Sequence, residues 1–240
     1  LVDQFLASYV SPPTLIVLDF DDTEDPVHGE QEQARYDGYY GGYCFLPLHL
    51  YEGLSGRLIT TIFKAKRFTG TQMLSVLKRL VKRLRQAWPD TLLIFRGDSH
   101  FAYPEVMQWI EAQANLSYVT GLTSNAVLQT LAREVVEQAK RAYERDGGKI
   151  TRFHSTRYQA GTWSRSRRVV IKVEVSDQGV NTRFVVTDME EARTKGLYQH
   201  IYCARGQAEN EIKDHKRYLK SDRTSCHRFE ANQFRVFLHS

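Results

Sequence analysis

The most informative stretch for the fold is Thr14-Leu15-Ile16-Val17-Leu18-Asp19-Phe20-Asp21-Asp22-Thr23, because it joins a continuous apolar run to a cluster of carboxylates. Such a run, which follows Pro12-Pro13 and ends in acidic residues, is typical of a buried strand. A second run, Thr91 to Phe95, leads into Arg96-Gly97-Asp98-Ser99 in the same manner. Ligands of open α/β sheets bind at the carboxyl ends of strands. The two runs therefore predict an α/β fold with acidic side chains gathered at one edge of the sheet.

Further patterned segments surround these two runs. The Gly- and Tyr-rich segment Tyr39 to Tyr51 and the run Leu58 to Ala65 predict a β-hairpin. Thr69 to Trp88 carries apolar residues at helical spacing, and Pro104 to Ala114 is a second helical segment. Leu116 to Leu122 is apolar again and predicts a strand. The order strand, hairpin, helix, strand, helix, strand predicts a mixed sheet with flanking helices.

The chain changes character after this core. Asn125 to Arg145 has a helical pattern, and Lys149 to Val186 alternates as β-strands do, with seven basic and no acidic residues between Lys149 and Lys172. From Glu190 the pattern is helical again through about Lys220. We therefore expect a β-rich insertion before the last helix. The expected divisions are residues 1–13 as the end of a preceding region, residues 14–124 and 188–240 as the core, and residues 125–187 as a helix plus the β insertion.

The composition describes a folded domain, with 240 residues, 42% hydrophobic residues and 25% charged residues. Lys and Arg exceed Asp and Glu by 33 to 28, and this net charge of +5 favours polyanionic partners. No window holds the roughly 18 consecutive apolar residues of a membrane span, so we expect no membrane partner. Cys44, Cys203 and Cys226 lack the spacing of a zinc site or a disulfide framework, which suits a reducing cytoplasm.

The late helical segment places one carboxylate among basic side chains. At 100° per residue, Glu209 lies within an arc of about 80° that it shares with Tyr202, Arg205, Lys213, Lys216 and Lys220. The neighbouring arc, expected to face the core, carries Ile201, Ala208, Ile212 and Leu219. An ion pair of Glu209 with Arg205 or Lys213 at helical spacing explains a lone acid in this stripe. A catalytic role for Glu209 explains it equally well.

Four motifs in order give the chain a family resemblance. The spacing Tyr202-x2-Arg205-x3-Glu209-x6-Lys216 resembles the Y-R-E-K signature of the DDE transposases of bacterial insertion sequences, in the group related to insertion sequence 4. A closer similarity, to the 1380-type transposases, covers nearly the whole chain. It rests on Leu18-Asp19-Phe20-Asp21-Asp22-Thr23 with Pro26-Val27-His28-Gly29, on Arg96-Gly97-Asp98-Ser99-His100-Phe101, on Cys203-Ala204-Arg205-Gly206-Gln207-Ala208-Glu209-Asn210, and on Asp222-Arg223-Thr224-Ser225-Cys226-His227 with Ala231-Asn232-Gln233-Phe234.

The resemblance implies a ribonuclease-H-like core in which the first and fourth strands are adjacent and carry two aspartates, while a later helix brings a glutamate. On this mapping the catalytic and metal-binding residues are Asp21, Asp98 and Glu209. Asp19 lies on the same face of the strand as Asp21 and is its partner or its substitute as a metal ligand. The group places a β insertion between its second and third acids. For any single strand-end Asp, a turn or helix N-cap role is the alternative.

The same resemblance implies the cofactor and the partners. Three carboxylates suit two Mg²⁺ ions, with Mn²⁺ as a substitute, because hard cations prefer oxygen ligands. The implied partner is double-stranded DNA with terminal inverted repeats, bound by a homodimer in the bacterial cytoplasm at the nucleoid. Residues expected to bind DNA are Tyr202, Arg205, Lys213 and Lys216 of the helix, with Trp163, Arg165, Arg167 and Arg168 of the basic β segment. Trp163 is a candidate for base stacking, and packing within a small β core is its alternative.

A different enzyme class also fits the first strand. Asp19-Phe20-Asp21-Asp22-Thr23 matches the DxDxT motif of haloacid-dehalogenase-like phosphatases, in which the first Asp is a nucleophile and the second an acid/base. That class predicts a second acid in a later GDxxxD pattern, and the residues after Gly97-Asp98 lack it. It also leaves Glu209 without a role. A DNA-binding relic without catalysis is a third reading, although all three acids are present.

Overall fold

The computed structural model describes residues 1–240, and the chain divides into two compact units, Leu1–Ile94 with Arg205–Ser240, and Phe95–Ala204. The first unit contains α1 (Val2–Ala7), β1 (Leu15–Asp22), β2 (Asp25–Pro26), β3 (Arg35–Asp37), β4 (Gly42–Phe45), β5 (Leu48–Glu52), β6 (Leu58–Ile62), α2 (Gly70–Ala87), α6 (Gly206–Leu219) and α7 (Phe229–Leu238). The second contains α3 (Pro104–Ile110), β8 (Leu116–Leu122), α4 (Ala126–Asp146), β9 (Ile150–Tyr158), β10 (Arg167–Ser176), β11 (Gly179–Thr187) and α5 (Thr194–Gly196). The unit boundary falls within β7 (Leu92–Gly97).

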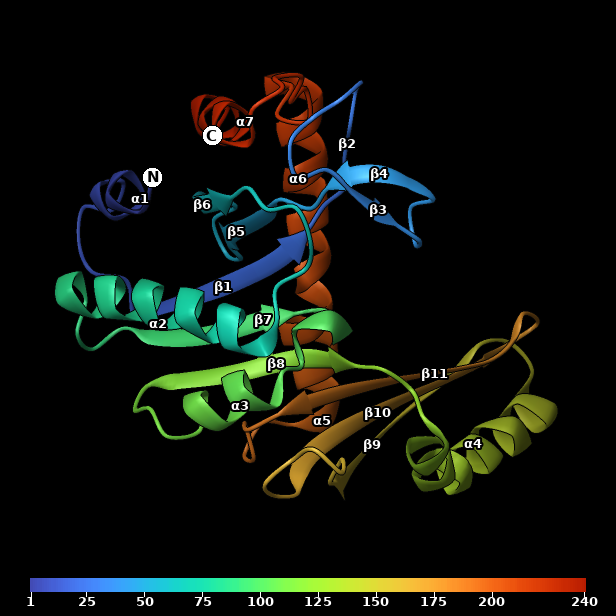
Figure 1. Ribbon diagram of the computed structural model, residues 1–240. Coiled ribbons are helices and arrows are strands. Elements are labelled where there is room, and N and C mark those ends of the chain that lie inside the picture. The colour runs from blue at the N-terminus through green and yellow to red at the C-terminus, as the bar shows by residue number, and fades with distance from the viewer. The chain divides into compact units, whose positions relative to one another are not determined.

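Eight strands form a mixed sheet in the hydrogen-bonded order β6-β5-β1-β7-β8-β11-β10-β9 (Figure 1). β1 pairs antiparallel with β5, which places Asp19 opposite Tyr51 and Asp21 opposite His49, and β5 pairs antiparallel with β6. The core strands are β1, β5, β6, β7 and β8. If they are numbered one to five along the chain, their order across the sheet is three-two-one-four-five, with β1 and β7 as neighbours. This is the strand order of a ribonuclease-H-like core, and the predicted α/β class with a mixed sheet is confirmed.

Local sequence explains where the long helices begin. α2 starts after Thr69, whose hydroxyl accepts from the Gln72 N–H while the Gln72 side chain accepts from the Thr69 N–H. Its buried face, which includes Leu77, follows the helical period. α4 starts after Asn125, whose side chain accepts from the Leu128 N–H. Both predicted helices are confirmed. No helix in the structure combines the length and the apolar character that crossing a membrane requires.

The β-rich insertion continues the sheet of the second unit. β9, β10 and β11 pair antiparallel in succession, and α4 packs against them (Figure 1). β11 then pairs antiparallel with β8, with Phe184 opposite Leu122 and Thr187 opposite Val119. The segment Lys149 to Val186, which was predicted to alternate as β-strands do, therefore forms three strands, and main-chain hydrogen bonds join the last of them to β8.

The segment between β1 and β5 departs from the prediction. We expected Tyr39 to Tyr51 to form one strand, and it instead divides into β4 and β5. β4 belongs to a separate three-stranded sheet with the order β2-β4-β3. The break falls at Leu46 and Pro47, and proline has no N–H with which to continue a ladder. The predicted hairpin survives as the pairing of β5 with β6.

The helical segment from Glu190 onward is broken, and the continuous helix that we expected was wrong. Leu197–Tyr202 is π-helical, Cys203–Arg205 is 3-10 helical, and regular α-helix begins only with α6. The buried Arg96 guanidinium donates to the Ile201 carbonyl, and a side chain that binds a carbonyl of the helical ladder distorts the helix there. A spacing of 100° per residue therefore does not hold across this break, and the calculated arc does not describe Tyr202 and Glu209 together. The last helix, α7, was not predicted.

Candidate active site

The carboxyl end of β1 presents aspartates in different environments. Asp19 is 0% exposed, whereas 15% of the Asp21 side chain is exposed. Asp22, on the other face of the strand, forms an ion pair with Lys64, with 2.8 Å between Oδ1 and Nζ. A metal ligand must face a space that phosphate and water can enter. Asp21 therefore suits that role better than Asp19.

Arg205 joins Asp21 to Glu209. Its Nη1 lies 3.3 Å from Asp21 Oδ2, and its Nη2 lies 2.7 Å from Glu209 Oε1. The second contact is the i,i+4 ion pair that we considered as the alternative role of Glu209. The first contact goes beyond that local pair, because one cationic group touches acids from β1 and from α6. Asp21 and Glu209 also offer hard oxygen donors, which a divalent metal ion prefers.

Asp98 follows β7 and caps a short 3-10 helix, Ser99–Phe101. Its Oδ1 accepts from the His100 N–H at 2.8 Å, and its Oδ2 lies 3.1 Å from His100 Nδ1. The N-cap role that we considered for a strand-end aspartate is therefore present. The Asp98 side chain is still 31% exposed, so the cap leaves the carboxylate accessible to a ligand.

Two residues that the sequence did not single out bring Tyr202 next to Asp98. A Cβ added to Gly121 of β8 would lie 2.7 Å from the Tyr202 hydroxyl, 2.8 Å from the Ser99 nitrogen and 3.2 Å from the Asp98 carbonyl carbon. The Tyr202 hydroxyl and the backbone after β7 therefore approach the same glycine. Arg96, one residue before Gly97, holds the helical segment that carries Tyr202. A glycine inside an apolar strand is a recognisable sign of such close approach.

Gly121→Ala is expected to lower the free energy of unfolding by about 1–3 kcal/mol, because the new methyl group meets backbone atoms that cannot rotate away. Urea unfolding measures this loss. Gly161→Ala is the matched control, since a Cβ there meets no atom within 4 Å. Equal unfolding free energies for the two variants would contradict the close approach of Tyr202 and Ser99 to β8.

Lys216 lies in a partly buried polar cluster on α6. Its Nζ donates to the Glu24 carbonyl, and the Thr224 hydroxyl donates to Asp25 Oδ2. Burial raises the pKa of the Asp25 carboxyl to about 7. The hydrogen bond from Thr224 and the charge of Lys216 lower this pKa but do not cancel the effect of burial. Burial lowers the pKa of Lys216, while the nearby carboxylates of Asp222, Asp25 and Glu24 raise it. Lys216 thus ties α6 to the segment that follows β1.

Three of the four DNA-binding candidates in the basic β segment are packed inside the protein. Trp163 is 6% exposed and lies against the Arg167 guanidinium, which is 5.0 Å from the ring centroid. Arg167 in turn pairs with Glu111, with 2.6 Å between Nε and Oε1. Arg168 is buried and donates to main-chain carbonyls of the loop before α5. The candidates that remain on the surface are Arg165 of this segment and Lys213 of α6.

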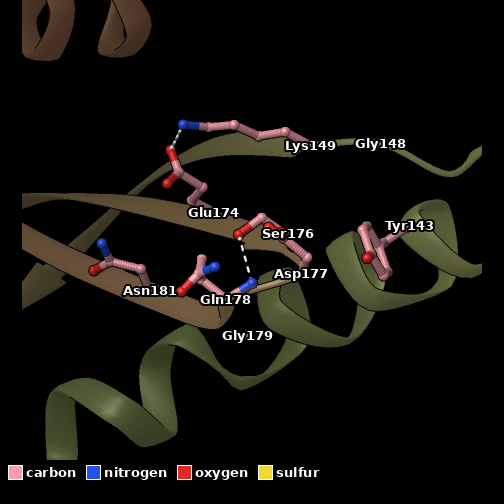
Figure 2. A pocket seen from close by; sticks show the side chains of 9 residues that line it. All are labelled: Tyr143, Gly148, Lys149, Glu174, Ser176, Asp177, Gln178, Gly179 and Asn181. Carbon is pink, nitrogen blue, oxygen red and sulfur yellow. Dashed lines mark hydrogen bonds and ion pairs between the residues drawn. The ribbon is translucent and has the colours of Figure 1, made fainter.

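A cavity of about 600 Å³ lies in the second unit, where the β10–β11 turn meets the start of β9 (Figure 2). Lys149 Nζ and Glu174 Oε2 form an ion pair at 2.9 Å beside it, and the Ser176 hydroxyl accepts from the Gln178 N–H. None of the predicted site residues lines this cavity. We therefore assign it no part in the candidate site.

Comparison with known proteins decides the family. A family described as "Transposase DDE domain group 1" matches residues 1–240. The chain belongs to this family. The predicted DDE transposase resemblance is thereby confirmed, while the 1380-type remains a prediction. No curated protein matches the chain.

A solved structure that this transposase domain resembles is titled "Cryo-EM structure of piggyBac transposase synaptic complex with hairpin DNA", with a TM-score of 0.48 and 14% identity. The match covers 99% of this chain and 50% of that one, so the domain spans half the length of that protein. The phosphatase alternative finds no support in the comparisons. It also requires Asp19 as a nucleophile, and Asp19 is fully buried.

Proposed function

We propose that this transposase domain catalyses metal-dependent DNA strand cleavage and strand transfer at the ends of an insertion sequence. The observation that carries the proposal is Arg205, whose guanidinium touches Asp21 and Glu209 at once. Membership of the transposase DDE family over the whole chain supports it. We assign Asp21, Asp98 and Glu209 as the catalytic metal ligands, with the buried Asp19 as a supporting residue behind Asp21.

The chemistry of the reaction explains why this site needs carboxylates. A phosphodiester is anionic and its leaving group is an alkoxide, so cleavage requires charge neutralisation and an activated water or 3′-hydroxyl. Two Mg²⁺ ions, or Mn²⁺ in their place, supply both when bound. Asp21, Asp98 and Glu209 would hold such ions through their carboxylate oxygens, and no covalent protein intermediate is required. Arg205 adds a planar, bidentate donor that suits a phosphate group.

The proposed partner is double-stranded DNA that carries terminal inverted repeats, bound by a homodimer in the bacterial cytoplasm at the nucleoid. The proposed DNA contacts are Tyr202 and Arg205, together with the exposed Arg165 and Lys213. Phosphate contacts of this kind make binding fall with salt, because each one releases condensed counterions. We leave Trp163, Arg167 and Arg168 out of the proposed contacts because their side chains are buried, and Lys216 because its ammonium group is bound to the Glu24 carbonyl. Arg205 is kept because the two acids that it contacts belong to the proposed site itself.

A strand-cleavage assay tests the proposed function. The full chain is incubated with DNA that carries the terminal repeats of its own element, in Mg²⁺, in Mn²⁺ and in EDTA. We expect cleavage at the repeat ends in either metal and none in EDTA. Absence of cleavage under all conditions would overturn the proposal. Hydrolysis of a small phosphate monoester that is lost in Asp19→Asn would instead establish the phosphatase alternative.

A further inference from the structure

Three strongly exposed tyrosines lie together on one hairpin. Tyr36, Tyr39 and Tyr43, which are 62%, 81% and 62% exposed, lie on β3, β4 and the turn between them. Tyr36 lies opposite Tyr43, and their rings meet edge to face with centroids 5.8 Å apart. Trp163, the stacking candidate of the sequence, is buried. The other strongly exposed aromatic residues lie near the C-terminal end and are Tyr218, Phe234 and Phe237. Gathered apolar surface of this kind marks a contact site.

Local hydrogen bonds build the turn of this hairpin. The Asp37 carboxylate accepts from the Tyr39 N–H at 2.9 Å and from the Tyr40 N–H at 3.4 Å. The Gly41 N–H donates to the Asp37 carbonyl at 2.8 Å, and Gly41 has a φ of +72°, which a side chain would resist. The backbone that carries the tyrosines is therefore held by hydrogen bonds within the hairpin itself. A partner that stacks on them meets a preorganised surface and loses little conformational entropy.

The hairpin stands close to the candidate catalytic acid of β1. It projects beyond the carboxyl end of that strand (Figure 1). Asp22 pairs with Leu48 of β5, and Tyr43 precedes Leu48 by five residues. At about 3.3 Å per residue, Tyr43 lies at most about 17 Å from Leu48, the residue that pairs with the end of β1. A DNA strand advances about 3.4 Å per nucleotide, so roughly five nucleotides cover the same distance.

We propose that the tyrosine hairpin, residues 35–45, binds unpaired nucleotides of DNA by stacking bases on Tyr36, Tyr39 and Tyr43. This inference rests on the proposed function, because it requires DNA to be bound at the acids of β1 and α6. Tyrosine rings accept any base, since every base has a π face. Arg35, which precedes Tyr36 in β3, is exposed and adds a cation to the hairpin. Bases in a duplex are already stacked on one another, so the hairpin prefers single-stranded to double-stranded DNA.

Equilibrium binding to a short single-stranded oligonucleotide that contains 2-aminopurine tests this proposal, in EDTA so that no cleavage occurs. Tyr39→Ala should weaken binding roughly 5- to 100-fold and reduce the quenching of 2-aminopurine, which reports stacking. Tyr39→Phe should bind as the parent does, whereas Tyr39→Leu, which keeps apolar area but lacks a π face, should behave as the alanine variant. Because Tyr39 is 81% exposed, none of these changes removes core packing.

Tyr218→Ala is the matched control, because Tyr218 is also strongly exposed and lies on α6. The proposal fails if Tyr39→Ala binds single strands as the parent does, or if Tyr218→Ala loses as much. It also fails if Tyr39→Ala changes the mass of the oligomer and leaves DNA binding intact, which would make the hairpin a protein interface. If the parent protein stacks bases but shows no metal-dependent cleavage, only the proposed function is refuted. If the parent protein cleaves DNA and Tyr39→Ala binds single strands as the parent does, only the proposed role of the hairpin is refuted.

Discussion

Glu209→Gln and Asp98→Asn should each slow DNA strand cleavage by about a thousandfold or more while leaving the fold intact. Each change replaces a carboxylate by an amide of the same shape, which removes the negative charge that a divalent cation requires. A metal ion supplies several kcal/mol of transition-state stabilisation, and about 4 kcal/mol corresponds to a thousandfold in rate. Asn retains the side-chain oxygen that caps the 3-10 helix after residue 98, so the local structure should persist.

Two readouts separate this loss from damage to the fold. Thermal unfolding of Glu209→Gln should match that of the parent closely, because the side chain is 47% exposed and its ion pair with Arg205 is a helix-surface pair. Mn²⁺ titration should show weaker metal binding. Glu211→Gln is the matched control, since Glu211 lies on the same helix, accepts from the Gln207 side chain and has no proposed role. If Glu209→Gln cleaved DNA as fast as the parent, Glu209 would not be a catalytic residue.

Glu111→Ala should lower the free energy of unfolding by about 3–5 kcal/mol, the largest loss of stability that we expect from one change in the second unit. Glu111 accepts from Arg167 through two hydrogen bonds and from the Tyr118 hydroxyl. The side chains of Glu111 and Arg167 are only 6% and 2% exposed. Removal of the acid leaves the Arg167 charge buried without its partner, and such a change is far costlier than the loss of a surface pair.

Chemical denaturation of the variants measures this effect. Arg165 pairs with the same carboxylate at 2.8 Å, but its side chain is 59% exposed. Arg165→Ala should therefore cost about 1 kcal/mol or less. If Glu111→Ala cost no more than Arg165→Ala, the buried pair would not organise this region. Arg167 would then again be a candidate for DNA contact.

The order of patterned segments was enough to predict the α/β class, the two strands that precede Asp21 and Asp98, and the starts of α2 and α4. These features depend on residues close together in the chain, such as the reciprocal cap of Thr69 with Gln72. The broken helix after Glu190 could not be predicted in this way. Its cause is a hydrogen bond from Arg96 to Ile201, more than a hundred residues away.

Residue type alone also does not reveal which side chains of the basic β segment are buried. Arg167, Arg168 and Trp163 look like a DNA-binding surface when they are read along the chain. Cross-strand pairing and the acid at Glu111 turn them inward. Conversely, Tyr39 and Tyr43 were predicted to lie on one strand with Tyr51. They belong to a separate hairpin because the strand breaks at Pro47 and the turn closes on Asp37.

Residue type and short-range periodicity establish which side chains can carry chemistry: acids after two apolar strands, one acid in a basic helical stripe, and the order that matches a transposase family. The tertiary structure then establishes which of these side chains reach solvent and which are engaged by distant partners. Burial of Asp19, the bridge from Arg205 to Asp21 and Glu209, and the inward pairing of Lys216 and Arg167 all depend on contacts between distant segments. Such contacts leave no local pattern, because burial is set by what packs against a residue.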